Sequence, residues 1–166
     1  MIEIKVKPKP VDIKKTALGQ HSSFDFLLQN ASDLELLIQE VKISVFDADG
    51  NLAWRRAANT NGIRPGIETP GNRTLETEPQ PCVFNPLHTL PADLPCEQLD
   101  HEFHLGAETG QTFKLRVAVS QEVYDTGTDL CLPIGGRPIA LDGHDFCPHH
   151  RRVDLMHPFL AQYMGF

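Results

Sequence analysis

Apolar and polar side chains alternate with a period of two through much of the chain, a pattern typical of β-strands that bury one face. The clearest run is residues 112–120. Its odd positions are predicted to face inward and its even positions outward: Phe113, Leu115, Val117 and Val119 against Lys114, Arg116 and Ala118. Residues 2–6 and 24–28 alternate in the same way. Pro8 and Pro10 end the first of these runs, because proline has no N–H for the ladder.

The alternation changes phase once, within residues 34–46. Its apolar positions are Leu34, Leu36 and Ile38, then Val41, Ile43 and Val45. A shift of one residue would turn half of these side chains away from the core, so the sequence predicts a β-bulge at Gln39-Glu40. A helix over residues 33–40 is the less favoured alternative.

Turn signals separate these runs at Asn30-Ala-Ser-Asp33, Asp49-Gly50, Thr109-Gly110 and Gly135-Gly136. Shorter strands are predicted at residues 73–76, 82–84, 99–105, 130–134 and 137–141. About eight or nine strands with a turn roughly every ten residues predict an all-β fold, an immunoglobulin-like antiparallel β-sandwich. We expect residues 1–155 to form this domain. Residues 156–166 then form an extension, either a short helix that starts at Pro158 or a truncated linker.

Composition narrows the classes of partner. The chain has 166 residues, enough for one domain with a sizeable core, and a formal net charge of -7. This acidic balance argues against nucleic acid or an anionic membrane as the main partner. The lysines of residues 5–15 are better explained as protection of an edge strand. We expect no membrane insertion, and no signal peptide is visible in the sequence.

The four cysteines leave two states open. Cys82, Cys96, Cys131 and Cys147 include no CxxC pair, which argues against a zinc knuckle. Cys82 and Cys96 could form a disulfide across a proline-rich loop, and free buried thiols are the favoured alternative.

Polar side chains are most concentrated at residues 141–155. This segment contains the candidate metal ligands His144, Asp145, His149, His150 and Asp154. Such donors suit zinc or iron, and His150 and Asp154 have the spacing HxxxD. A catalytic zinc needs three protein ligands, however, and adjacent histidines in an extended segment point to opposite faces. The favoured interpretation is a hydrogen-bonded polar closure, in which Arg151 and Arg152 pair with Asp145 or Asp154.

Other catalytic patterns are weaker. His101-Glu-Phe-His104 has the spacing HxxH, but residues three apart on a strand point to opposite faces. No serine lies in a Gly-x-Ser-x-Gly elbow. Cys147 lies near His144 and His149 in sequence, which does not by itself give the geometry of a thiol–imidazole pair. We therefore expect this chain alone to be non-catalytic, with no required cofactor.

Several segments together resemble a known family. They are Phe26-Leu-Leu-Gln-Asn30, Val45-Phe-Asp-Ala-Asp-Gly50, Phe84-Asn-Pro-Leu-His88, Leu132-Pro-Ile-Gly-Gly-Arg-Pro-Ile139, Asp142-Gly-His-Asp-Phe146 and His149-His-Arg-Arg-Val-Asp154. The series is similar to the β-sandwich region that precedes the catalytic domain in some bacterial lysostaphin-type zinc metallopeptidases. The resemblance implies an accessory domain that positions, regulates or binds. Its partner would be an attached or neighbouring peptidase domain or a cell-wall component, outside the cytoplasm.

The chain departs from that family in its metal-binding elements. The peptidase domain of the family holds zinc through an HxxxD element and a later HxH element. This chain has no HxH, and its HxxxD at His150 lies in the block that would precede the peptidase domain. We therefore assign no zinc ligands by resemblance. The alternative function is a small metal-binding protein or metal-dependent hydrolase that uses the cluster between His144 and Asp154.

Overall fold

The computed structural model describes residues 2–7, 9–22, 24–59, 74–75, 82–84 and 89–123. Strands dominate this part of the chain and no helix occurs in it, which confirms the predicted all-β class. It also contains no helix suited to crossing a membrane. The strands are β1 Ile2–Lys7, β2 Val11–Thr16, β3 Gly19–Ser22, β4 Asp25–Asn30, β5 Leu36–Phe46, β6 Leu52–Asn59, β7 Thr74–Leu75, β8 Cys82–Phe84, β9 Thr89–Leu90, β10 Gln98–Ala107 and β11 Thr112–Val123. The strands predicted at residues 130–134 and 137–141 and the helix predicted at Pro158 lie outside the described residues.

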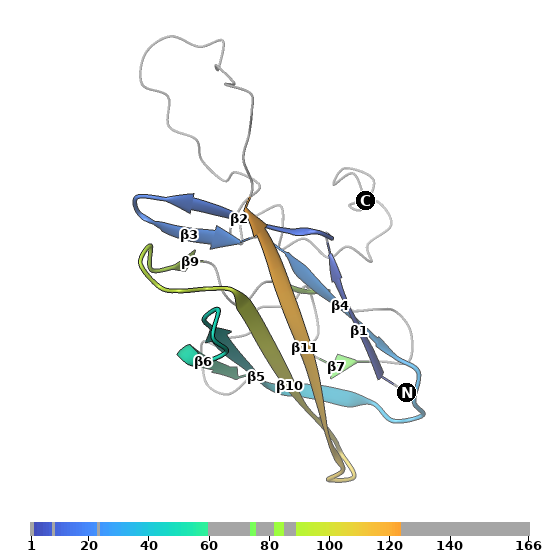
Figure 1. Ribbon diagram of the computed structural model, residues 1–166. Coiled ribbons are helices and arrows are strands. Elements are labelled where there is room, and N and C mark those ends of the chain that lie inside the picture. The colour runs from blue at the N-terminus through green and yellow to red at the C-terminus, as the bar shows by residue number, and fades with distance from the viewer. Residues whose placement is uncertain are drawn as a thin grey trace, which may run out of the picture.

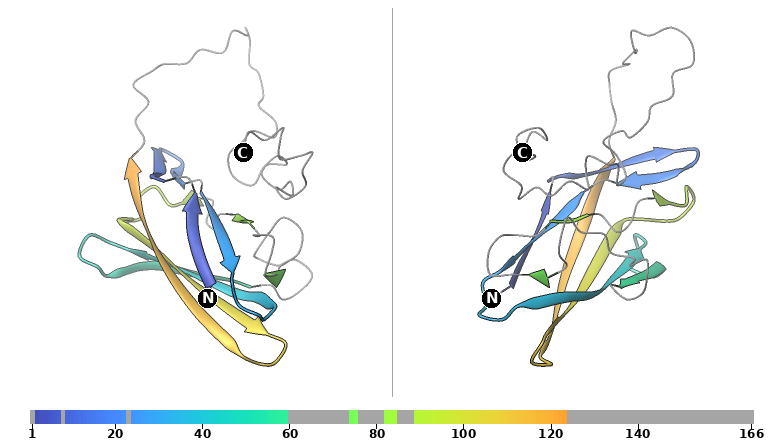
Figure 2. Two further views of the ribbon diagram at one scale, coloured as in Figure 1. Left: turned by 90° about the vertical axis from the view of Figure 1, so that its right-hand side faces the viewer. Right: turned by 180° about the vertical axis from the view of Figure 1, so that it is seen from behind.

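The strands form two sheets. The small sheet has the order β1-β4-β8, and the large sheet has the order β6-β5-β10-β11-β2-β3-β9, with β7 paired to β5. The long strands of the large sheet curl, and β1 and β4 lie across their concave side (Figures 1 and 2). The order β6-β5-β10-β11 corresponds to strands C′, C, F and G of an immunoglobulin-like sandwich, and β1-β4-β8 corresponds to A, B and E.

One pairing differs from the predicted antiparallel arrangement. β2 pairs in parallel with the end of β11, from Gln121↔Val11 to Val123↔Ile13, so the large sheet is mixed. The chain leaves the small sheet after β1 and enters the large sheet at β2. The prolines at positions 8 and 10 end the first ladder as predicted, but the pattern did not reveal the β2–β3 hairpin that follows.

Aromatic side chains from the two sheets meet in the core. Phe24, at the start of β4, and Phe26 are fully buried from one side, and Phe103 and His101 of β10 are fully buried from the other. The Phe26 ring lies edge-on to Phe103, with centroids 5.0 Å apart, and to His101 at 4.7 Å. Edge-to-face contacts of this kind stabilise beyond the burial of area alone, by about 0.5–1.5 kcal/mol each.

The predicted β-bulge is present in β5. Glu40 pairs with His104 and Ile38 pairs with Leu105, so Gln39 is the extra residue. Ile38 and Val41 are both fully buried, although they are three positions apart, a spacing that places side chains on opposite faces of a regular strand. A Cβ at Gly106 would overlap the side-chain amide of Gln39, so the bulged residue uses the space that this glycine leaves open. The alternative helix over residues 33–40 is wrong.

Side chains stabilise two of the predicted turns. The Asp47 carboxylate accepts hydrogen bonds from the backbone N–H of Asp49 at 3.0 Å and of Asn51 at 2.8 Å. Gly50 completes this hairpin turn at a φ of 79°, where a residue with a side chain is strained. At the other turn, the buried Asn30 amide donates to the carbonyls of Leu34 and Leu75, each at 2.8 Å. Asn30 thus ties β4 to the start of β5 and to β7.

The bulge leads to a prediction about deletions. Removing Gln39 restores continuous alternation, because outward Glu40 then follows inward Ile38, and the free energy of unfolding should change by less than about 1 kcal/mol. Removing Lys42 instead also removes one residue from β5, but with Ile38 and Ile43 both inward it points the Glu40 carboxylate into the core and Val41 to the outside. That change should cost more than about 4 kcal/mol. Denaturant unfolding of both variants measures the difference, and an equal loss in both would contradict the assigned bulge.

Candidate functional site

The cluster singled out in the sequence lies beyond the part of the chain that the structure describes. This applies to the candidate metal ligands His144, Asp145, His149, His150 and Asp154 and to their neighbours Cys147, Arg151 and Arg152. Whether these residues bind metal or form a polar closure therefore remains a prediction from sequence. Within the described ranges, no three His, Cys, Asp or Glu side chains come together in a way that could hold a metal ion.

The two histidines with HxxH spacing point to opposite faces, as the strand phase predicts. His101 is fully buried between the sheets, whereas the His104 side chain lies on the outer face of β10 and is 18 % exposed. The pair therefore cannot share a metal or a proton, and each histidine has a separate role.

His101 is an imidazole in a dry, aromatic environment. It contacts the rings of Phe24 and Phe26, and neither of its ring nitrogens has a hydrogen-bond partner among the residues that the structure describes. Burial lowers the pKa of His101 to about 3, because a charged imidazolium would lose its hydration without gaining a partner. At neutral pH His101 is an uncharged packing residue.

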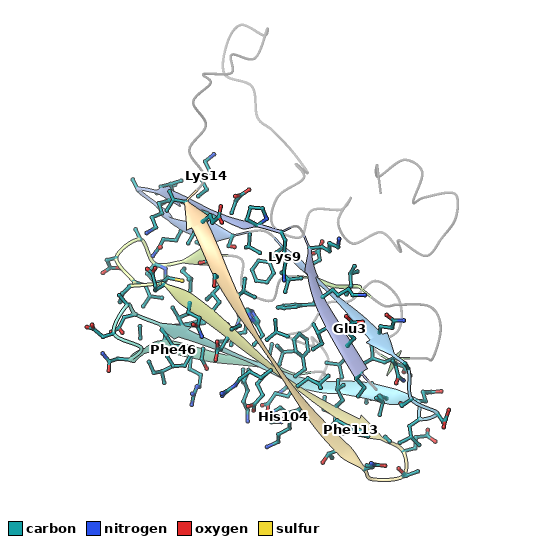
Figure 3. The ribbon with its side chains drawn as sticks, turned by 45° about the vertical axis from the view of Figure 1, so that its right-hand side comes forward. Glu3, Lys9, Lys14, Phe46, His104 and Phe113 are labelled. Atoms are coloured by element: carbon teal, nitrogen blue, oxygen red, sulfur yellow. The ribbon has the colours of Figure 1, made fainter. Side chains whose placement is uncertain are left out.

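His104, which is labelled in Figure 3, contacts two carboxylates on the outer face of the large sheet. Its Nε2 lies 2.6 Å from Oε1 of Glu102, and its Nδ1 lies 3.5 Å from Oε2 of Glu40 on β5. The hydrogen bond from His104 is the main cause of the lowered pKa of Glu102. Because its two nitrogens engage different carboxylates, the three side chains form a cross-strand chain rather than a common centre.

The same outer face continues onto β11. Arg116 lies 3.8 Å from Glu102 and 3.9 Å from Asp100, but its side chain remains 66 % exposed. Lys42 on β5 approaches Glu40 at 3.3 Å. Exposed pairs of this kind contribute about 0–1 kcal/mol each, so this face is a surface of alternating charge more than a source of stability.

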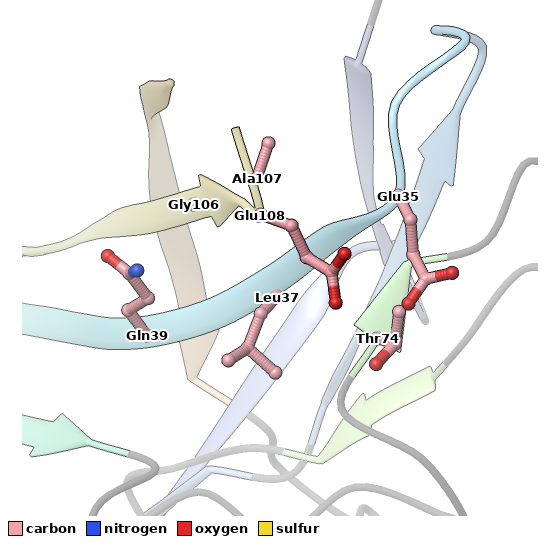
Figure 4. Close-up of a pocket in the computed structure, with 7 residues that line it drawn as sticks. All are labelled: Glu35, Leu37, Gln39, Thr74, Gly106, Ala107 and Glu108. Carbon is pink, nitrogen blue, oxygen red and sulfur yellow. The ribbon is translucent and has the colours of Figure 1, made fainter. Parts of the chain in front are cut away.

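A small pocket lies beside the bulge (Figure 4). Its volume is about 210 Å³. It is lined by Glu35, Leu37, Gln39, Thr74, Gly106, Ala107 and Glu108. The side chain of Leu37 forms an apolar part of the lining and is 42 % exposed.

The chemistry of this pocket comes from two acidic residues. Glu35 precedes β5 and Glu108 follows β10, and both side chains line the pocket (Figure 4). Carboxylates beside an apolar surface suit a positively charged group or a hydrogen-bond donor. The sequence pattern does not reveal this pocket, because only the pairing of β5 with β10 brings residues 35 and 108 together.

Cys96 carries a free thiol, in agreement with the favoured alternative for this residue. The thiol donates a hydrogen bond to Oε1 of Gln121 at 3.3 Å. Burial raises the pKa of Cys96, and the charge of Lys15 opposes that effect. A thiol whose pKa is raised is a weak nucleophile at neutral pH, which argues against a reactive role for Cys96.

Comparison with known proteins gives little further information. No family model matches the chain, and no curated protein matches it. One solved structure, described as the X-ray structure of Northeast Structural Genomics Consortium target SoR45, is 14% identical. The match covers 83% of this chain and 96% of that chain, with a TM-score of 0.43. This likeness is too distant to support an argument about fold or function.

The buried imidazole of His101 predicts a loss of stability in mild acid. As the pH falls below 6.5 the unfolded chain binds a proton at His101, but the folded chain does not until about pH 3. The unfolded state binds more protons within this window, so the free energy of unfolding should fall by about 2 kcal/mol between pH 7.5 and pH 5 from this group. Denaturant unfolding at several pH values measures this loss.

The variants His101→Leu and His104→Gln test the assignment. His101→Leu replaces two unpaired nitrogens with an apolar side chain of similar size, and it should remove most of this loss of stability in acid. His104→Gln changes an imidazole on the outer face, so the free energy of unfolding of this variant should still fall in acid because of His101. If both variants show the same pH dependence as the wild-type chain, His101 is not the group that titrates.

Proposed function

We propose that this chain is a non-catalytic β-sandwich accessory domain associated with a bacterial cell-wall metallopeptidase. It acts outside the cytoplasm by binding or positioning, through its surface. The resemblance carried by the segments between Phe26 and Asp154 motivates this proposal. The partner is an attached or neighbouring peptidase domain or a component of the cell wall.

The observation that best supports a binding role is the difference between the two faces of the large sheet. Its inner face supplies the packed core, which includes Phe103 and Val41. Its outer face carries alternating charges that reach solvent, with Glu102 and Arg116 among them. A rigid scaffold with a patterned polar surface is suited to contacts with a partner, because the strands hold the side chains at fixed spacings.

The acidic pocket supports the same role. Glu35 and Glu108 flank an apolar surface where β5 begins and β10 ends, and Leu37 in this pocket is partly exposed to solvent. Cationic groups on a polymer or on a partner protein are suitable ligands for such a pocket. This chemistry requires recognition and no bond-making step.

We expect the purified chain to bind insoluble cell-wall material without degrading it. Co-sedimentation with purified bacterial cell walls measures the bound fraction, and soluble amino groups released over time measure hydrolysis. The variant Glu35→Gln with Glu108→Gln tests the pocket, with Glu3→Gln on β1 as a control at an exposed carboxylate outside it. Time-dependent release of fragments by the isolated chain would contradict the non-catalytic role.

The alternative function is metal binding or metal-dependent hydrolysis by the cluster between His144 and Asp154, which the density of donor side chains favours. An accessory domain should contain less than a stoichiometric amount of metal when it is purified without chelator. Its melting temperature should then be unchanged by EDTA, because a chelator lowers stability only where a bound metal contributes its binding free energy to folding. Stoichiometric zinc or iron, together with a large loss of stability in EDTA, would favour the alternative.

A further inference from the structure

Along most of its length, one edge of β11 has no neighbouring strand in the part of the chain that the structure describes. Residues 112–120 pair with β10 on one side of the strand. On the other side, β2 pairs only with the last three residues of β11, from Gln121 to Val123. Among the residues that the structure describes, the backbone of residues 112–120 therefore has no strand beside it on this edge.

This edge lacks a described neighbour because the chain passes from β1 in the small sheet to β2 in the large sheet, and β2 reaches only the end of β11. β2 lies at the end of β11, and the residues before β2 turn away to form β1 beside β4 (Figure 1). An added strand would continue the line of β2 along the rest of β11. Residues 112–123 contain no proline, so each of them has a backbone N–H and can contribute to a ladder.

Burial of the inner face becomes incomplete at this edge. On β10, the inward side chains of His101, Phe103 and Leu105 are fully buried. Their cross-strand partners on β11 are Val117, Leu115 and Phe113, which pack against the core but remain partly exposed. Apolar side chains on an added strand would cover this row and would gain favourable free energy from the burial.

The outer face of the same edge is positively charged. Lys114 and Arg116 are its charged residues between positions 112 and 120, and both are exposed. Lys114 has no ion-pair partner within the described residues, and Arg116 approaches carboxylates only at 3.8 and 3.9 Å. Acidic side chains on an added strand would therefore be favourable cross-strand neighbours.

The charge pattern also distinguishes between possible occupants. If two copies of β11 paired antiparallel with residue 115 at the centre, Lys114 of each copy would lie opposite Arg116 of the other. Like charges directly opposite each other are destabilising. Cationic side chains on an edge are a common protection against self-association, and here they leave the edge open to an acidic strand.

We propose that residues 112–120 of β11 accept an extended peptide segment of a partner protein by β-strand addition. The alternate side chains of that segment are apolar towards the core and acidic towards the outer face. In this recognition mode, backbone hydrogen bonds give affinity and the alternating side chains give specificity. The inference rests on the proposed accessory function, because it names the surface through which such a domain contacts its partner.

Three synthetic peptides test the proposal on the full chain. The first alternates Val with Glu over the length of residues 112–120, the second alternates Val with Lys, and the third alternates Pro with Glu. NMR titration follows the backbone amides. We expect the Val/Glu peptide to bind and to shift and protect amides of residues 112–120, while the amides of β6, at the other side of the sheet, stay unchanged. The other two peptides should bind at least about tenfold more weakly.

Charge reversal provides the matched variants. Lys114→Glu, alone and with Arg116→Glu, should weaken binding of the Val/Glu peptide by about tenfold and strengthen binding of the Val/Lys peptide. Lys7→Glu reverses an exposed charge on β1 and should change neither affinity. The single variant Lys114→Glu removes no ion pair found among the described residues, so it should remain folded.

Three results would overturn the proposal. They are no binding of the Val/Glu peptide at millimolar concentration, equal binding of the Pro/Glu peptide, and protection of both edges of β11 in the free protein. The last result would mean that another part of this chain already covers the edge. These outcomes are separate from failure of the accessory function, because cell-wall hydrolysis by the chain would refute that function without affecting the peptide titration.

Discussion

The dry contact between β4 and β10 is the interaction on which the rest of the structure depends. Phe24 and Phe26 meet His101 and Phe103 edge-on, and all four side chains are fully buried. Because side chains alternate along a strand, placing residues 101, 103 and 105 inward places residues 100, 102 and 104 outward. The core contact thus sets the position of the charged outer face. It also explains why His101 is held neutral while His104, three residues further on, pairs with carboxylates.

The β-bulge at Gln39 affects both the core and the surface of the domain. It lets both halves of β5 keep their apolar side chains in the core, although their phases differ. The extra residue lies against Gly106, at the place where the small acidic pocket forms between β5 and β10. Bulges often redirect side chains at the edges of sheets and beside binding sites. The bulge that preserves the core therefore also helps to shape this pocket.

The distribution of charge fits a domain that works by contact. The chain is acidic as a whole, with a formal net charge of -7, yet the outer row of β11 carries Lys114 and Arg116 and no carboxylate between residues 112 and 120. The pocket beside the bulge has the opposite sign, with Glu35 and Glu108. The two surfaces would therefore recognise groups of opposite charge, and the same rigid sheet holds both.

The sequence by itself determined the local features of this protein. Alternation of apolar and polar residues predicted the strands and the inward face of β11, and the change of phase predicted the bulge at Gln39. Asp49-Gly50 predicted a hairpin turn, because a short acidic residue and a glycine tolerate its backbone angles. Each of these features depends on neighbours in the sequence, where steric and burial effects have a fixed period.

Only the tertiary structure decided which strands lie side by side. It placed β2 parallel to β11, brought Glu35 and Glu108 to one pocket, and left one edge of residues 112–120 without a partner strand among the described residues. The sequence could not reveal these features, because each depends on a pairing between segments far apart in the chain. A strand's own pattern specifies which face is buried and says nothing of its neighbour, since backbone hydrogen bonds are the same for every partner.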